Sequence, residues 1–200
     1  MPSILCFGDS NTYGYYPNGM SGDRYPADVR WTGILESKGF TVIDEGMCGR
    51  SVPVDPRLVE SFFERWEKLD PPDIFMIMLG GNDLLHDESV TPEEVGNRMD
   101  GFLSELPRLS WYDPSHTLLV APVPMVEGAW VFDDELIEKS GRLGKNYERL
   151  AAKHGIAFAD AAAWRVKKVF DGVHFSEEGH AAFAKGLLDV PLVKKVLAEG

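Results

Sequence analysis

Residues 4–12 read Ile4-Leu5-Cys6-Phe7-Gly8-Asp9-Ser10-Asn11-Thr12, an apolar run that passes at once into small and polar residues. Consecutive apolar residues are typical of a strand buried on both faces, as in a parallel sheet, because a half-exposed strand would alternate. Glycine and short polar residues favour a turn directly after it. The stretch therefore predicts a buried strand that delivers polar side chains to one edge of a sheet.

The same pattern recurs along the chain, and each run precedes a turn and then a segment with helical spacing. The further runs are Thr41–Ile43, Ile74–Leu79, Thr117–Ala121 and Ile156–Ala159. Five strands that alternate with helices imply βαβ units. We therefore predict an α/β fold, a three-layer α/β/α sandwich built on a five-stranded parallel sheet.

Helical spacing and capping residues mark the intervening segments. Thr91-Pro92-Glu93-Glu94 combines a capping threonine, a proline at the first helical position and a glutamate three residues after the cap. The predicted helices contain Trp31, Ile34 and Leu35 on one face; Leu58, Phe62, Trp66 and Leu69 on one face; the segment after Thr91; Leu136–His154, ended by Gly155; and Ser176–Leu188, with Val193–Ala198 as an extension.

The charge balance excludes two classes of partner. The 200 residues include 20 Lys and Arg against 32 Asp and Glu, a formal net charge of −12. A general nucleic-acid binder needs a basic face, and an anionic membrane surface would repel such a chain. We therefore expect no nucleic-acid partner and no membrane partner. The length is typical of one domain spanning residues 1–200.

Cysteine content and the N-terminal residues bear on location. Cys6 and Cys48 lie beside apolar stretches and are expected to be buried free thiols in a reducing compartment. Met1–Phe7 has neither a basic region nor a long apolar region, so no signal peptide is expected. No stretch approaches the roughly 20 apolar residues of a membrane span. We expect a cytoplasmic protein.

Polar groups follow four of the predicted strands. Gly8–Thr12, Gly46–Arg50, Gly80–Asp83 and Asp171–His174 supply a hydroxyl, two turns rich in backbone N–H groups, a carboxamide, a carboxylate and an imidazole. Ligands of open parallel sheets bind beyond the carboxyl ends of the strands. This set of groups is the one that nucleophilic acyl transfer requires.

Each group has a definite task in such chemistry. A serine hydroxyl needs a base, and histidine has a suitable pKa of about 6.5. A carboxylate on the other ring nitrogen holds the imidazole in one tautomer, and Asp171 lies three residues before His174. A glycine N–H and an asparagine side chain suit the oxyanion. Asp9 is interpreted as a turn former, and the spacing of His180 from His174 fits no common metal site.

Gly8-Asp9-Ser10, Gly49, Gly81-Asn82-Asp83 and Asp171-Gly172-Val173-His174 resemble, in order, the four sequence blocks of the SGNH, or GDSL-type, hydrolases. Residues 6–15 and Arg30-Trp31 are most similar to the arylesterase and acetylesterase branch. The resemblance implies the flavodoxin-like SGNH hydrolase fold. We expect no cofactor and no metal. The resemblance also implies Ser10 as nucleophile, His174 as base, Asp171 as its orienting partner, and an oxyanion hole of Ser10 N–H, Gly49 N–H and the Asn82 side chain.

Three features qualify the resemblance. Cys48 stands where the second block often has asparagine, and Gly81 stands where the third often has threonine. Neither change removes a catalytic group, although both alter the shape of the pocket. The motif Gly-x-Ser-x-Gly is absent, which argues against an α/β-hydrolase elbow.

The predicted function is a serine esterase that hydrolyses small, short-chain acetyl or aryl esters through an acyl-enzyme. Its partner is then a small-molecule ester. Alternatives are a thioesterase, lysophospholipase or acyltransferase with the same residues, and a catalytically silent carbohydrate-binding relative. A flavodoxin-like signalling or nucleotide module is a further alternative, but the chain lacks a glycine-rich phosphate loop.

Two features leave alternatives open. Tyr13, Tyr15, Trp130 and Phe132 either line an acyl or aryl pocket or belong to the core or an interface. The segment Pro122–Asp134 is too apolar for a plain solvated connection, so it either covers a pocket or joins another subunit. Relatives in this branch often form homo-oligomers, which the segment would allow.

Overall fold

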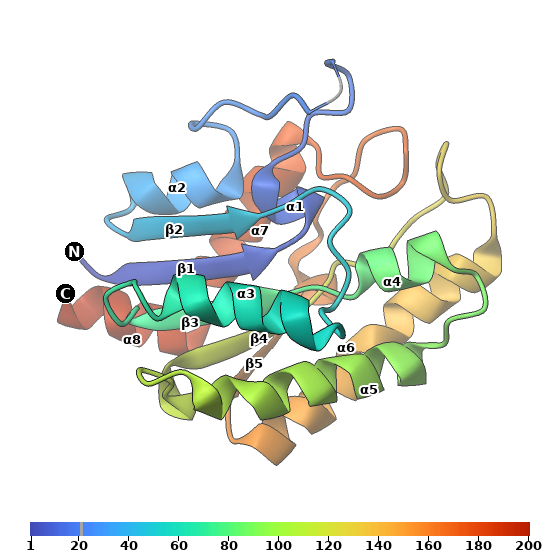
Figure 1. Cartoon of the computed structure of the whole chain (residues 1–200). Coiled ribbons are helices and arrows are strands. Elements are labelled where there is room, and N and C mark those ends of the chain that lie inside the picture. The colour runs from blue at the N-terminus through green and yellow to red at the C-terminus, as the bar shows by residue number, and fades with distance from the viewer. Residues whose placement is uncertain (21) are drawn as a thin grey trace.

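A computed structural model of the protein describes residues 1–20 and 22–200. Its strands form one parallel sheet in the order β2-β1-β3-β4-β5 (Figure 1). This confirms the predicted five-stranded α/β fold. The strands are β1 (Ser3–Gly8), β2 (Thr41–Gly46), β3 (Ile74–Met78), β4 (Thr117–Ala121) and β5 (Ala157–Asp160).

Helices cover both faces of the sheet (Figure 1). Helices α3, α5 and α6 pack on one face, and α2, α7 and α8 pack on the other, which gives the predicted three layers. The helices are α1 (Ser10–Tyr13), α2 (Trp31–Ser37), α3 (Pro56–Trp66), α4 (Gly81–His86), α5 (Pro92–Glu105), α6 (Asp134–His154), α7 (Glu177–Leu188) and α8 (Pro191–Glu199), with short 3-10 helices at Leu106–Arg108, Pro114–His116 and Ala161–Trp164.

Strand β1 contributes side chains to both core layers. Leu5 and Phe7 face α3, α5 and α6, while Ile4 and Cys6 face the opposite layer. The Phe7 ring meets the indole of Trp66 edge-on, with centroids 4.8 Å apart. Burial on both faces is therefore confirmed for β1. It is wrong for β2 and β5, which are only partly buried because they form the two edges of the sheet.

The predicted helix ends are confirmed where their capping chemistry is explicit. The Thr91 hydroxyl accepts a hydrogen bond from the Glu94 N–H, and the Glu94 carboxylate accepts one from the Thr91 N–H. Gly155 ends α6 with a left-handed φ of 67°. The Ser176 hydroxyl accepts from the Gly179 N–H and begins α7.

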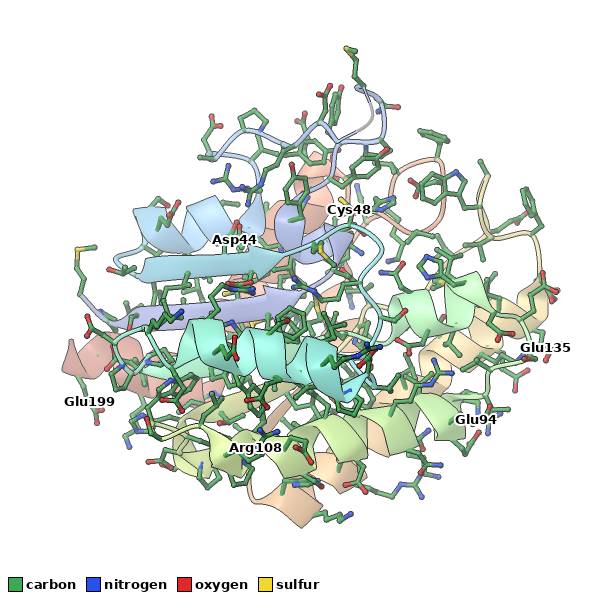
Figure 2. All side chains as sticks on the ribbon, in the orientation of Figure 1. Asp44, Cys48, Glu94, Arg108, Glu135 and Glu199 are labelled. Carbon is green, nitrogen blue, oxygen red and sulfur yellow. The ribbon has the colours of Figure 1, made fainter. Side chains whose placement is uncertain are left out.

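Several local expectations are wrong. Leu58 is 44% exposed, and Val59 is buried on that face of α3 instead. Cys6 is buried as expected, but Cys48 is exposed because it lies in the turn after β2 (Figure 2). Strand β2 continues to Gly46 despite its polar residues. The sequence pattern does not predict the short helices α1 and α4. Helix α1 begins immediately after β1, and α4 begins shortly after β3.

The two chain termini and the polar sequence motifs lie at opposite ends of the sheet (Figure 1). The carboxyl ends of the strands lead into α1 and α4, whereas both termini lie at the other end of the sheet (Figure 1). No helix in the described part of the chain is long and apolar enough to span a membrane.

Candidate active site

Ser10, His174 and Asp171 form a continuous line of polar contacts. The Ser10 Oγ lies 3.0 Å from Nε2 of His174, and Nδ1 of the same ring lies 2.7 Å from Oδ2 of Asp171. All three residues are buried, with 5%, 3% and 0% of their surfaces exposed. The structure therefore brings together a hydroxyl, an imidazole and a carboxylate from positions 164 and 161 residues apart, 174 − 10 and 171 − 10.

The Asp171 carboxylate is held in its charged form. Burial alone would raise its pKa, but the His174 ring and the N–H groups of His174 and Val173 all donate to it. The two amides lie 2.9 and 2.8 Å from Oδ1. Together the donors outweigh burial and lower the pKa below its ordinary value. A charged Asp171 fixes the orientation of the imidazole.

Asp9 sets the position of Ser10. Its carboxylate accepts the Asn11 N–H at 2.9 Å and caps the single turn of α1, which places Ser10 at the first helical position. This is the turn-forming role expected from the sequence. Burial raises the pKa of Asp9, while His174, Lys168 and Arg50 oppose that shift.

Gly49 and Asn82 lie beside Ser10. Gly49 occupies the left-handed region at φ 75° in the turn closed by the Arg50 N–H and the Met47 carbonyl. The Asn82 side chain donates one amide hydrogen to the Arg50 carbonyl at 3.0 Å, which leaves its second hydrogen available. Ser10, Gly49, Asn82 and His174 all line one cavity of about 320 Å³.

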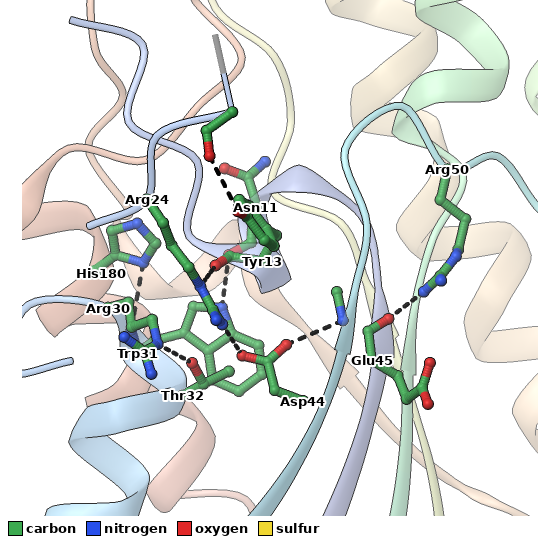
Figure 3. Close-up of polar contacts among 12 residues, drawn as sticks. Asn11, Tyr13, Arg24, Arg30, Trp31, Thr32, Asp44, Glu45, Arg50 and His180 are labelled. Atoms are coloured by element: carbon green, nitrogen blue, oxygen red, sulfur yellow. Dashed lines mark hydrogen bonds and ion pairs between the residues drawn. The ribbon is translucent and has the colours of Figure 1, made fainter. Parts of the chain in front are cut away.

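Arg50 joins the elements that carry these groups, although no sequence motif identifies it as a site residue. Its buried guanidinium donates to the Gly8 carbonyl at 2.9 Å. The same group donates to the Glu45 carbonyl (Figure 3). It also lies 4.5 Å from the centre of the Phe7 ring. The side chain therefore ties the end of β1 to the end of β2. Its acceptors are backbone carbonyls, which leave no pairing signal in the sequence.

Two of the four selected aromatic residues lie at the cavity. The rings of Tyr15 and Trp130 lie 4.7 and 5.2 Å from the His174 ring, and both line the cavity. The Tyr13 hydroxyl instead donates to the Gly22 carbonyl, and Arg24 lies over its ring (Figure 3). Phe132 is 86% exposed and lines an adjoining groove, which shares Trp130 with the cavity.

The segment Pro122–Asp134 packs on the turn that carries Asp171. The N–H groups of Val126, Ala129 and Trp130 donate to the carbonyls of Gly172, Phe170 and Asp171, at 3.1, 2.9 and 3.1 Å. Of the two alternatives left open by the sequence, this geometry describes a segment that forms one wall of the cavity.

His180 lies apart from this cavity. It is 1% exposed, its Nδ1 accepts the Trp31 N–H at 3.4 Å, and burial lowers its pKa to about 3. The ring is therefore a neutral member of the core near α2. Within residues 1–20 and 22–200, no group of three or more His, Cys, Asp or Glu side chains is arranged to hold a metal ion.

Comparison with known proteins identifies the family. The model of the GDSL-like lipase/acylhydrolase family matches residues 6–182. No curated protein sequence matches the chain. The solved structures that resemble it include an aryl esterase from M. smegmatis, at 27% identity and a TM-score of 0.80, with 99% of each chain covered. A carbohydrate acetylesterase from Sinorhizobium meliloti matches at 27% identity and 0.81, with 100% of each chain covered.

A more distant structure shares the fold alone. It is a member of the lipolytic protein G-D-S-L family from Veillonella parvula, at 20% identity and a TM-score of 0.71, covering 96% of this chain and 98% of that one. The family match spans most of the chain, so the protein belongs to the GDSL-like lipase/acylhydrolase family. By class it is a carboxylic ester hydrolase, and the resemblance to SGNH hydrolases is confirmed.

Proposed function

We propose that the protein is a serine esterase that hydrolyses small, short-chain acetyl or aryl esters through an acyl-enzyme. The observation that carries this proposal is the line Ser10 Oγ, His174 and Asp171, with contacts of 3.0 and 2.7 Å, at the wall of the cavity. A nucleophile, a base and an orienting carboxylate in this arrangement activate a hydroxyl at neutral pH.

The first half-reaction follows from the contacts. Ser10 Oγ attacks the ester carbonyl while Nε2 of His174 takes the hydroxyl proton. Asp171 accepts the Nδ1–H throughout and stabilises the imidazolium. The carbonyl oxygen becomes an oxyanion, for which Ser10 N–H, Gly49 N–H and the free Asn82 amide hydrogen serve as donors. Collapse of this intermediate breaks the bond to the alcohol, which takes the proton from His174.

The second half-reaction uses the same groups. A water molecule gives a proton to Nε2 of His174 and attacks the acyl carbonyl. The new oxyanion occupies the same donors, and its collapse releases the carboxylic acid and returns the proton to Ser10. Since each step needs the same three donors, loss of any one slows both halves.

The walls of the cavity support small, neutral substrates. Tyr15, Leu85 and Trp130 are among the residues that line it, and its volume of about 320 Å³ suits a small ester. The net charge of −12 favours uncharged esters over phosphorylated ones. Similar structures carry the names aryl esterase and carbohydrate acetylesterase, which supports both alcohol types. The free thiols Cys6 and Cys48 suit the cytoplasmic location that we propose with this function.

The test is turnover of p-nitrophenyl acetate by the wild type, Ser10→Ala and the control Ser61→Ala. Ser61 lies on α3, where its hydroxyl donates to the Leu58 carbonyl. We expect Ser10→Ala to abolish both turnover and labelling by a fluorophosphonate probe, and Ser61→Ala to leave both unchanged. Turnover that survives Ser10→Ala would refute the proposal. A series of ester and thioester chain lengths, with and without an added alcohol acceptor, separates hydrolysis of short esters from thioesterase, lysophospholipase and acyltransferase activity.

A further inference from the structure

Lys168 is half-buried, and its ammonium group lies next to the segment that carries His174. Its Nζ donates to the Val173 carbonyl at 3.0 Å and reaches the Val123 carbonyl at 3.4 Å. The same nitrogen lies 5.2 Å from the centre of the Phe175 ring. Val123 follows β4 near the start of the segment Pro122–Asp134, which forms one wall of the cavity and is called the covering segment below. One side chain therefore contacts both the covering segment and the residues on each side of His174.

Asn11 also binds the backbone on each side of His174, and it approaches from the side of Ser10. Its side-chain Nδ2 donates to the Val173 carbonyl at 3.3 Å, and its Oδ1 accepts the Phe175 N–H at 2.9 Å. Asn11 adjoins Ser10, so this pair of hydrogen bonds couples the position of Ser10 to that of His174. The Val173 carbonyl is thus shared by two donors, one from the nucleophile side and one from Lys168.

Charged groups from two neighbouring elements face the ammonium. Asp9 lies on the turn between β1 and α1, and Asp171 lies on the turn that follows Lys168 along the chain. Lys168, Asp9 and Val173 line an internal cavity of about 20 Å³ together with Ser10. Burial lowers the pKa of Lys168 to about 8, although both carboxylates act to raise it. The charged form is therefore only partly compensated.

We propose that Lys168 is a positioning residue for the esterase reaction: its ammonium holds the Val173 carbonyl, and through it the His174 ring, in place against Ser10. It acts through the backbone and does not touch substrate. The inference rests on the proposed function, because its effect is measured on the Ser10-dependent reaction.

A residue that merely fills space would behave differently. Methionine has almost the same length and volume as lysine, and it occupies the site without any donor or charge. If Lys168 only packs, Lys168→Met leaves kcat unchanged. If the ammonium positions His174, the same variant lowers kcat. Lys168→Met also removes the donor to the Val123 carbonyl and a positive charge beside Asp9 and Asp171, so we expect the free energy of unfolding at pH 7 to fall.

The experiment compares Lys168→Met, Lys168→Arg and the matched control Lys167→Met. Lys167 is the neighbouring residue, with an exposed side chain that pairs with Glu178. For each protein, kcat and KM for p-nitrophenyl acetate are measured from pH 5 to 10, and unfolding is measured in denaturant. We expect Lys168→Met to lower kcat about tenfold with KM within about twofold, since misplacement of a reacting group acts mainly on kcat. We expect Lys167→Met to match the wild type.

The pH profile supplies a second readout. Wild-type kcat should fall as pH rises past about 8, because Lys168 then loses its proton and becomes a weaker donor. Lys168→Met should lack this alkaline limb, and Lys168→Arg should keep activity to higher pH if it folds. The inference would be overturned if Lys168→Met had the same kcat as the wild type and showed the same fall in kcat at alkaline pH. So would an activity loss that only follows a loss of folded protein. If the proposed function itself is wrong, Ser10→Ala retains wild-type turnover, which is a separate result.

Discussion

The main-chain N–H of Trp130 donates a hydrogen bond to the carbonyl oxygen of Asp171, at 3.1 Å. The same tryptophan presents its ring edge-on to His174, 5.2 Å away. One residue of the covering segment therefore contacts both the backbone of the orienting carboxylate and the imidazole. The wall of the cavity and the polar line to Ser10 form one packed unit, so a change in the covering segment should alter chemistry as well as binding.

Gly128 packs tightly against the backbone of the Asp171 turn. A Cβ on Gly128 would lie 2.4 Å from the carbonyl carbon of Asp171, which is backbone and unable to yield easily. We predict that Gly128→Ala pushes the covering segment away from Asp171 and lowers the free energy of unfolding by roughly 1–3 kcal/mol. We also expect kcat to fall by about 10²-fold, because the Asp171 turn moves with it.

Gly141→Ala is the matched control for this substitution. Gly141 lies in α6, and a Cβ there meets nothing within 4 Å. Alanine in an exposed helix should stabilise the protein by about 0.5–1 kcal/mol and leave kcat unchanged. The pair is compared by denaturant unfolding and p-nitrophenyl acetate kinetics. Equal stability and equal kcat in both variants would show that Gly128 is not under steric constraint.

Asp171→Asn should separate the orientation of His174 from its presence. An amide at this position favours the wrong tautomer of the ring, which in Ser-His-Asp sites lowers kcat by about 10⁴. We expect KM to change little and the fluorophosphonate labelling rate to fall in parallel with kcat. A labelling rate equal to that of the wild type would contradict the proposed role of Asp171.

The same variant also carries a pH prediction for stability. The pKa of Asp171 lies below its ordinary value of 3.8, so the folded state binds this proton less tightly than the unfolded state. Its contribution is present at neutral pH and is lost as pH falls through the folded pKa. The difference in unfolding free energy between wild type and Asp171→Asn should therefore be largest near pH 7 and shrink below about pH 4.

The sequence predicted the sheet because its central strands are uninterrupted apolar runs, but it misplaced features that depend on neighbours. Strand β2 extends through Asp44 and Glu45, which pair with Arg24 and Arg65 at the edge of the sheet. Periodicity does not reveal such distant partners. Helices α1 and α4 span four and six residues, too few for any helical period to show.

Sequence motifs predict the site residues, and the structure brings Ser10, Gly49, Asn82, Asp171 and His174 together. The side chains that connect these residues could not be predicted from the sequence. Arg50 and Asn11 donate to backbone carbonyls of residues distant in sequence, and Lys168 reaches the distant Val123 carbonyl as well as the nearby Val173 carbonyl. Side-chain to backbone bonds impose no complementary residue at the other end, so a single sequence holds no trace of them.

Trp130 should govern the preference for aromatic esters. Its ring lines the cavity beside His174 and remains 46% exposed, so it can pack against an aryl group. We predict that Trp130→Ala raises KM for phenyl acetate by about tenfold, the value of one aromatic pair, and raises KM for ethyl acetate much less. Tyr13→Phe is the control, since Tyr13 itself does not line the cavity and keeps its ring in this variant. Equal changes for the two esters would argue against an aryl contact.

His180 should make the protein sensitive to mild acid without taking part in the reaction. Burial lowers its pKa from 6.5 to about 3, so between these values the unfolded state binds a proton that the folded state does not. Stability must therefore fall as pH drops below 6.5, by about 2 kcal/mol between pH 7 and pH 5.

The test compares urea unfolding of wild type, His180→Asn and the control His116→Asn at pH 7 and pH 5. Asparagine places its Oδ1 near the position of Nδ1 and can still accept the Trp31 N–H, but it does not titrate. His180→Asn should be less stable than wild type at pH 7 because it leaves a cavity, and it should lose less stability on acidification. His116, an exposed residue, should behave like wild type. An equal loss in all three proteins would show that His180 does not resist protonation in the folded state.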